Sequence, residues 1–130
     1  MNEYLYNKND QVTLYKGNSL DVLKTLPDES INCVVTSPPY YNLRDYGHKD
    51  QLGLEATLHE YIVNLVDIFK EVKRVLAEDG TVWLNIGDKY SKADDMANNV
   101  KQKDLMGIPF KVAFALQDDG WYLRQDIIWD

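Results

Sequence analysis

The chain has 130 residues, a formal net charge of −7 and a single cysteine, Cys33. This length allows one domain with a real hydrophobic core, and no apolar run approaches the roughly 20 residues that cross a bilayer. The lone cysteine excludes an internal disulfide and favours a reducing, cytoplasmic location. Metal sites are not expected, because Cys33, His48 and His59 lack ligand spacing. The acidic charge argues against strong nucleic-acid binding by this chain alone.

The first predicted elements are a strand, a turn and a short helix. Val12 to Lys16 alternates apolar and polar side chains and is followed by Gly17-Asn18, which indicates a strand that ends in a turn. Ser19 is the expected N-cap of a helix over residues 20–26, which Pro27 ends.

The most informative stretch follows the next strand. Ile31 to Thr36 is apolar and rich in β-branched residues, so we expect a buried strand with Cys33 inside it. In Ser37-Pro38-Pro39-Tyr40-Tyr41, two prolines then end the strand and force an extended backbone. A hydroxyl, a rigid turn and an aromatic ring thus meet at the carboxyl end of a strand, where ligands bind in open α/β sheets. A packing turn or a polyproline ligand segment would use the same residues.

The second half of the chain predicts two helices and two strands. Thr57 begins a capping box and a helix with one apolar stripe as far as Leu76, and Gly80 is expected at its C′ position. Thr81 to Ile86 is the next buried strand. After a polar, flexible loop over residues 89–103, the pattern predicts a helix over 108–117 and a strand over 122–129. This alternation indicates an α/β fold with a mainly parallel sheet and flanking helices.

Seven blocks of the sequence carry a family resemblance. They are Gly17-Asn18-Ser19, Thr36 to Gly47, Gly53-Leu54-Glu55, Glu71 to Leu76, Leu84 to Asp88, Asp104 to Phe110 and Gly120 to Trp129. In this order they resemble the DNA amino-methyltransferases, which methylate cytosine N4 or adenine N6 with S-adenosylmethionine. The resemblance is to the permuted group, in which the catalytic half precedes the cofactor half. It implies a Rossmann-like S-adenosylmethionine-dependent methyltransferase fold.

The resemblance also implies roles for individual residues. The implied catalytic residues are Ser37, Pro38, Pro39 and Tyr40. The Ser37 hydroxyl and the Pro38 carbonyl would accept hydrogen bonds from the target amine, and Tyr40 would stack on the flipped base. Serine at the first position favours cytosine N4 over adenine N6. Carbon-5 methylation is disfavoured, because it needs an activated cysteine and Cys33 is expected inside the strand.

Further residues are implied to bind the cofactor or the substrate. The cofactor-binding set is Asn18, Ser19 and Thr36, and the substrate-binding set is Tyr41, Arg44, Asn85 and Asp88. Many relatives carry an acidic residue where this chain has Asn18. A strand-ending turn with a capping carboxylate would equally explain Asn85 and Asp88, and a solvated loop pair would explain Arg44 and Asp45.

The sequence lacks the glycine-rich turn of such cofactor sites, since no Gly-x-Gly occurs in it. We therefore expect residues 1–130 to form the catalytic half of the domain, without the cofactor half and the target-recognition region. The expected partners are DNA and a second chain that supplies the cofactor half. Val12 to Lys16 should then lack sheet neighbours. The alternative is a non-enzymatic remnant or interaction module that keeps the fold.

Overall fold

The computed structural model describes residues 2–130, which divide into two compact units. The described part of the first unit consists of residues 2–36 and 67–83, and the second unit consists of Ser37–Val66 and Leu84–Asp130. Among the described residues, no helix is both long and apolar enough to cross a membrane.

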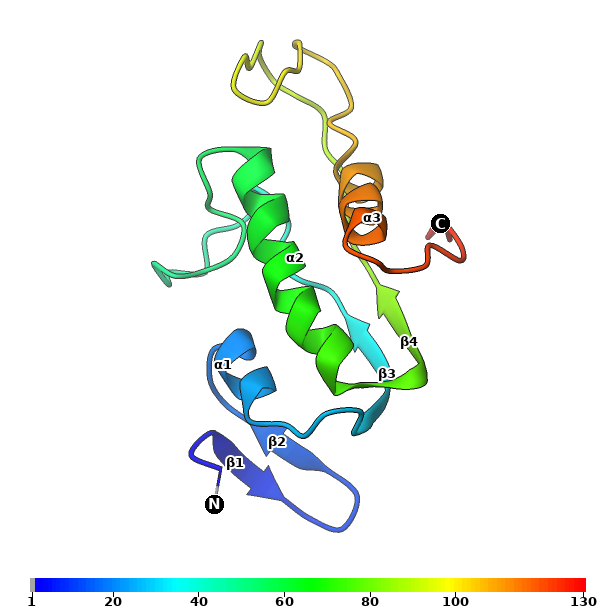
Figure 1. Cartoon of the computed structure of the whole chain (residues 1–130). Helices are drawn as coiled ribbons and strands as arrows, with labels where there is room; N and C mark the ends of the chain where they lie inside the picture. Colours follow the sequence, from blue (N-terminus) through cyan, green and yellow to red (C-terminus); the bar gives the residue numbers. More distant parts are fainter. Residues whose placement is uncertain (1) are drawn as a thin grey trace. The chain divides into compact units, whose positions relative to one another are not determined.

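The first unit begins with a hairpin that the sequence predicted only in part. Strand β1 (Leu5–Lys8) pairs antiparallel with β2 (Thr13–Tyr15), as Figure 1 shows at the N-terminal end. The Asn9 side chain builds the turn, because its Oδ1 accepts the amides of Gln11 and Val12 at 2.9 and 2.8 Å. The predicted strand at 12–16 is therefore confirmed in its centre, but the expectation that it lacks a neighbour is wrong.

Helix α1 (Ser19–Lys24) is held at both ends by side chains. Asn18 is its N-cap and accepts the amide of Leu20 at 3.0 Å, so the prediction of Ser19 in this role is wrong by one residue. After the helix, Arg74 donates to the carbonyls of Leu23 and Leu26 at 2.8 and 3.0 Å. The Leu23 carbonyl also accepts the amide of Leu26 at 3.0 Å, so Arg74 adds a second donor at this helix end.

Strands β3 (Ile31–Thr36) and β4 (Leu76–Leu84) form a two-stranded sheet and run in the same direction (Figure 1). The prediction of a buried β3 is wrong for one face. Val35 is 79% exposed and Trp83 is 52% exposed, and Cys33 and Thr81 are also exposed. The alternation of strand side chains puts these residues on the same side, which leaves one face of the sheet open.

Helix α2 (Leu58–Val75) connects β3 to β4 and begins as predicted, because the Thr57 hydroxyl accepts the amide of Glu60 at 3.2 Å. Its apolar stripe is buried: Leu58, Tyr61, Leu65, Phe69, Val72 and Val75. β4 starts directly at Leu76, earlier than the predicted Thr81, and includes Gly80. Gly80 is therefore not a C′ residue. A glycine is needed there for room, since a β-carbon would lie 2.5 Å from Cγ of Leu76.

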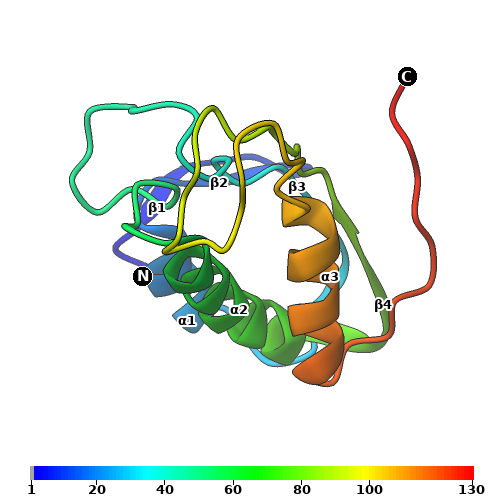
Figure 2. The same ribbon diagram turned by 90° about the horizontal axis from the view of Figure 1, so that it is seen from above.

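In the second unit, helix α3 (Ile108–Asp118) has Pro109 in its first turn, as predicted. The loop before it is pinned by bridges between Tyr90 and Leu105 and between Asp95 and Val100. Figure 2 shows the chain after α3 as an extended trace. The predicted strand over 122–129 is wrong, because these exposed residues have no regular secondary structure. A strand needs a neighbour for its backbone hydrogen bonds, and the described residues supply none here.

Candidate active site

The turn from Ser37 to Tyr40 is anchored to helix α2 through the carbonyl of Pro39. The hydroxyl of Tyr61, on α2, donates a hydrogen bond of 2.9 Å to the Pro39 carbonyl. Ser37 is exposed and Pro38 is half-buried. Within the part of the chain that the structure describes, neither the Ser37 hydroxyl nor the Pro38 carbonyl has a hydrogen-bond partner. Two oxygen acceptors are thus available side by side in the sequence, and the next carbonyl is occupied.

Two glycines approach Tyr40 more closely than any other residue type could. A β-carbon on Gly87 would lie 2.6 Å from Cε2 and 3.0 Å from Cδ2 of the Tyr40 ring. A β-carbon on Gly53 would lie 2.8 Å from the Tyr40 carbonyl oxygen, and Gly53 also has a φ of +106°. The ring is therefore packed on the backbone at Gly87, and the carbonyl on the backbone at Gly53.

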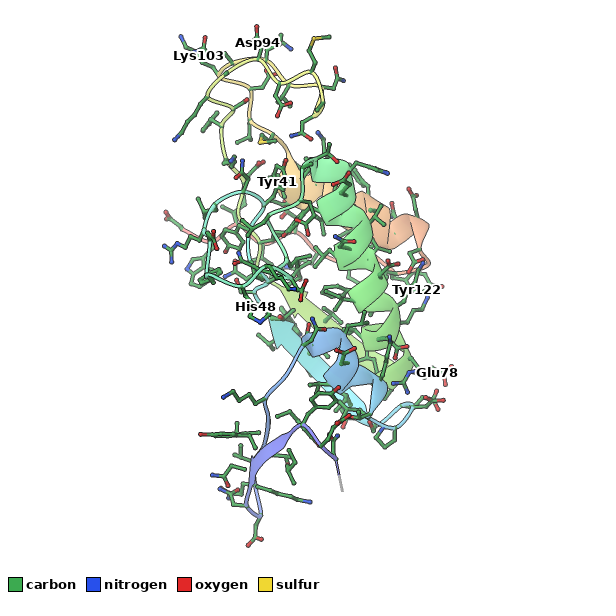
Figure 3. The ribbon with its side chains drawn as sticks, turned by 90° about the vertical axis from the view of Figure 1, so that its left-hand side faces the viewer. Tyr41, His48, Glu78, Asp94, Lys103 and Tyr122 are labelled. Atoms are coloured by element: carbon green, nitrogen blue, oxygen red, sulfur yellow. The ribbon has the colours of Figure 1, made fainter. Side chains whose placement is uncertain are left out.

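Tyr41 belongs to the core of the second unit. Its side chain is only 4% exposed, and its hydroxyl accepts a bond of 3.1 Å from Nδ2 of Asn98. Its ring centroid lies 5.6 Å from that of Tyr61. Figure 3 labels Tyr41 near the start of α2. A contact between Tyr41 and a substrate stays a prediction, since these neighbours already account for its burial.

The loop after Tyr41 folds back on itself and carries Arg44 on its outside. The amide of Asn42 donates to the carbonyl of Gly53 at 2.7 Å, which closes the loop at its base. Gln51 accepts the amide of Tyr46 at 2.7 Å and donates to the carbonyl of Arg44 at 2.6 Å. His48, labelled in Figure 3, is exposed on the same loop, as is the Arg44 side chain.

Asp88 caps helix α3 from a distance. Its Oδ2 accepts the amide of Gly107 at 2.9 Å, and its Oδ1 accepts the amides of Ile108 at 3.2 Å and Lys89 at 2.8 Å. Gly107 is the N-cap residue and has no side chain to fill this role. The capping interpretation of Asp88 is therefore observed. Asn85 is half-buried nearby in the sequence, and a role for either residue in substrate binding stays a prediction.

The predicted cofactor-binding residues lie in the first unit. The Asn18 side chain is engaged in capping α1, Ser19 is the first residue of that helix, and Thr36 is the last residue of β3. With one carboxamide oxygen already committed and no glycine-rich turn, these residues do not fit a complete cradle for S-adenosylmethionine. The described residues also contain no group of three His, Cys, Asp or Glu side chains that could hold a metal ion.

Sequence reasoning missed the residues that hold the turn. Tyr61 lies in the helix that the sequence predicts from Thr57, and Gly87 directly follows the strand predicted over Thr81 to Ile86, but the sequence predicts no contact of either residue with the turn. The one available signal was the placement of Gly53 and Gly87 in blocks of the family resemblance. Their contacts with Tyr40 come from the fold, since Gly53 and Gly87 are separated from it by a loop and by α2 with β4.

The chain is similar in sequence and in structure to DNA methyltransferases. A family model described as DNA methylase matches residues 31–130. The type II methyltransferase M.XycI of Xanthomonas campestris pv. cyanopsidis is 53% identical, over 91% of this chain and 46% of its own length. M.Cfr9I of Citrobacter freundii is 47% identical with the same coverage. The solved structure of the PvuII DNA methyltransferase (cytosine-N4-specific) matches with a TM-score of 0.59 and 30% identity, over 82% of this chain and 33% of that one.

The chain thus spans less than half the length of these relatives. Its α/β architecture is that of part of a methyltransferase fold, as the match to a solved methyltransferase indicates. Since the family model covers most of the sequence, the chain belongs to the DNA methylase family, the amino-methyltransferases that its motifs resemble.

Proposed function

We propose that this chain is the catalytic half of a DNA methyltransferase that methylates an exocyclic base amine, with cytosine N4 favoured over adenine N6. The observation that carries the proposal is the Ser37 to Tyr40 turn. It offers a hydroxyl and a carbonyl without partners among the described residues, while the Pro39 carbonyl is engaged by Tyr61. Family membership supports this interpretation of the turn.

The chemistry explains why two oxygen acceptors are needed. The lone pair of an exocyclic amine is delocalised into the base, so the nitrogen is a weak nucleophile. When the Ser37 hydroxyl and the Pro38 carbonyl accept its two N–H groups, the nitrogen becomes pyramidal and its lone pair is available for attack. S-adenosylmethionine, when bound by the complete protein, supplies the methyl group on a positively charged sulfur. The chain's own residues act by orientation and hydrogen bonding, without a covalent intermediate.

Tyr40 is the proposed stacking partner of the flipped base. Its ring rests on the backbone of Gly87, which fixes the position of the ring for stacking. Stacking of a base on an aromatic ring contributes about 1–3 kcal/mol. The preference for cytosine N4 is supported by serine in the first position of the motif and by the cytosine-N4-specific solved neighbour.

The proposed partners are DNA and a protein region that supplies the cofactor half. This chain has a net charge of −7, so most phosphate contacts must come from elsewhere. Arg44 is exposed on its loop and is the proposed contribution of this chain to DNA contact. The cofactor half is proposed as a separate region because the relatives are more than twice as long as the part that matches this chain.

A hybrid enzyme tests the proposal. In this hybrid, the present chain replaces the part of the Xanthomonas relative that it matches. We expect the hybrid to transfer labelled methyl groups to DNA and to yield N4-methylcytosine. Ser37→Ala should lower kcat by about 100-fold or more, because it removes an acceptor used at the reacting atom. Its binding of DNA should change little.

Ser30→Ala is the matched control, since Ser30 is an exposed serine of the first unit whose hydroxyl donates locally to the Pro27 carbonyl. A hybrid that transfers no methyl group, beside an active relative, would contradict the proposed function. Full activity of Ser37→Ala would contradict the role of that serine. N6-methyladenine as the product would contradict only the preference for cytosine N4 and not the proposed methylation of a base amine.

A further inference from the structure

The proline turn depends on a donor from outside itself. Pro38 and Pro39 have fixed φ angles and no N–H groups, so the turn has no backbone donors at its centre. The hydroxyl of Tyr61 fills this gap by donating to the Pro39 carbonyl at 2.9 Å. This bond joins α2 to the motif that carries the proposed acceptors.

Tyr61 is built to hold one position. Its side chain is fully buried, with an exposed fraction of 0%, and its ring packs at 50° to the ring of Tyr41. A ring that the core immobilises presents its hydroxyl at one point in space. The bond to Pro39 is therefore ordered in advance, unlike a contact from an exposed side chain that must first lose rotamer freedom.

The hydroxyl also stays a donor. Burial raises the pKa of Tyr61 well above the usual value for tyrosine, and the nearby Glu55 and Tyr40 raise it further. The group therefore keeps its proton throughout the neutral and mildly alkaline range. Without the Tyr61 hydroxyl, the half-buried Pro39 carbonyl would have no hydrogen-bond partner among the described residues.

The far end of the turn is fixed by a second contact. The Tyr40 carbonyl lies against the backbone of Gly53, whose amide donates to Oε2 of Glu55 at 2.9 Å. Nδ2 of Asn64, on α2, donates to the other oxygen of Glu55 at 3.2 Å. The Pro39 carbonyl is thus bonded to Tyr61 of α2. The Tyr40 carbonyl packs on Gly53, which is linked to α2 through Glu55 and Asn64.

We infer that Tyr61 is a positioning residue for methyl transfer: by holding the Pro39 carbonyl, its hydroxyl fixes the direction in which the Ser37 hydroxyl and the Pro38 carbonyl face the target amine. This inference rests on the proposed function, because it concerns the same two acceptors. The hydroxyl of Tyr61 performs this role, whereas its ring packs in the core.

The test compares Tyr61→Phe with Tyr4→Phe. Both variants remove one tyrosine hydroxyl and keep the ring, and Tyr4 is a partly buried residue of the first unit. In the isolated chain, nuclear magnetic relaxation at the Ser37 and Tyr40 amides reports the order of the turn. In the hybrid enzyme, kcat and the KM values for DNA and S-adenosylmethionine report catalysis.

In Tyr61→Phe we expect the order parameters at Ser37 and Tyr40 to fall from about 0.85 towards 0.6, with those of α2 unchanged. We expect kcat to fall by about 10- to 100-fold, with both KM values within about twofold, because orientation is lost and binding is kept. Tyr4→Phe should match the parent in both measurements.

Unchanged order at Ser37 and Tyr40, or an unchanged kcat, would overturn the inference. Loss of order throughout α2 would also overturn it, since the hydroxyl would then support the core and not the turn. A parent hybrid without activity would contradict the proposed function instead, and the order parameters would still decide whether Tyr61 holds the turn.

Discussion

Gly87 sets the distance between the Tyr40 ring and the backbone that follows β4. Any side chain there would place a β-carbon 2.6 Å from the ring, a separation that forces the ring or the backbone to move. We therefore expect Gly87→Ala to shift the Tyr40 ring and to destabilise the chain by about 1–3 kcal/mol, as overpacking does. In the hybrid enzyme, kcat should fall because the stacking surface is displaced.

The measurements are the chemical shifts of the Tyr40 ring and the free energy of unfolding in urea. Gly107→Ala is the control, because Gly107 has a φ of +72° but no atom within 4 Å of its would-be β-carbon. It should lower stability through backbone strain and leave the Tyr40 ring where it is. Equal ring shifts in both variants would contradict a specific contact at Gly87.

At this scale the sequence identified the motif but not its supports. Ser37, Pro38 and Tyr40 are recognisable because they are consecutive. The bond from Tyr61 joins residues 22 positions apart, and nothing local in an amphipathic helix marks which buried tyrosine uses its hydroxyl. Asp88 was predictable as a capping group, although the helix that it caps begins 20 residues later.

Helix α3 depends on Asp88 for its N-terminal cap. Its own N-cap residue, Gly107, makes no side-chain bond, and the carboxylate of Asp88 accepts the amides of Gly107 and Ile108. We expect Asp88→Ala to destabilise the chain by about 0.5–2 kcal/mol and to speed hydrogen exchange in the first turn of α3. Urea unfolding and exchange at residues 107–112 measure the two effects.

Asp118→Ala is the matched control at the opposite end of α3. Asp118 is the last residue of the helix, where a negative charge is unfavourable to the helix dipole. Its removal should leave stability equal or slightly higher. Comparable losses in both variants would mean that a general effect of removing an aspartate near α3, and not capping, explains the effect of Asp88.

The predicted elements succeeded where the pattern was long and local. The apolar stripe of α2 and the proline start of α3 lie in the structure as expected. β1 was missed because Leu5–Lys8 is short and carries no clear alternation, and it forms only by pairing with β2. The segment 122–129 contains residues that favour strands, such as Tyr122, Ile127 and Trp129, but it lacks a neighbour among the described residues, so local sequence could not decide its state.

Each unit leaves apolar surface uncovered at the scale of the whole molecule. In the first unit this surface is the face of the β3–β4 sheet with Val35 and Trp83, and in the second it is the end of the chain with Ile128 and Trp129. Contiguous exposed apolar patches are typical of interaction surfaces. The part of each relative that matches this chain is less than half of that relative's length. The proposal of a separate cofactor half therefore predicts that this additional region covers the open sheet face.

Cys33 provides a direct probe of that proposal, because it is exposed on the open face and is the single cysteine of the chain. A small thiol reagent should modify Cys33 rapidly in the isolated chain. In the hybrid enzyme the reaction should slow by at least about tenfold, because the added region covers the β3–β4 face and modification then requires local opening. Mass spectrometry of the peptide that contains Cys33 measures both rates.

In urea the two proteins should react equally, which separates coverage from the intrinsic reactivity of the thiol. Equal rates under native conditions would contradict coverage of this face and would direct the search for the docking surface to the second unit.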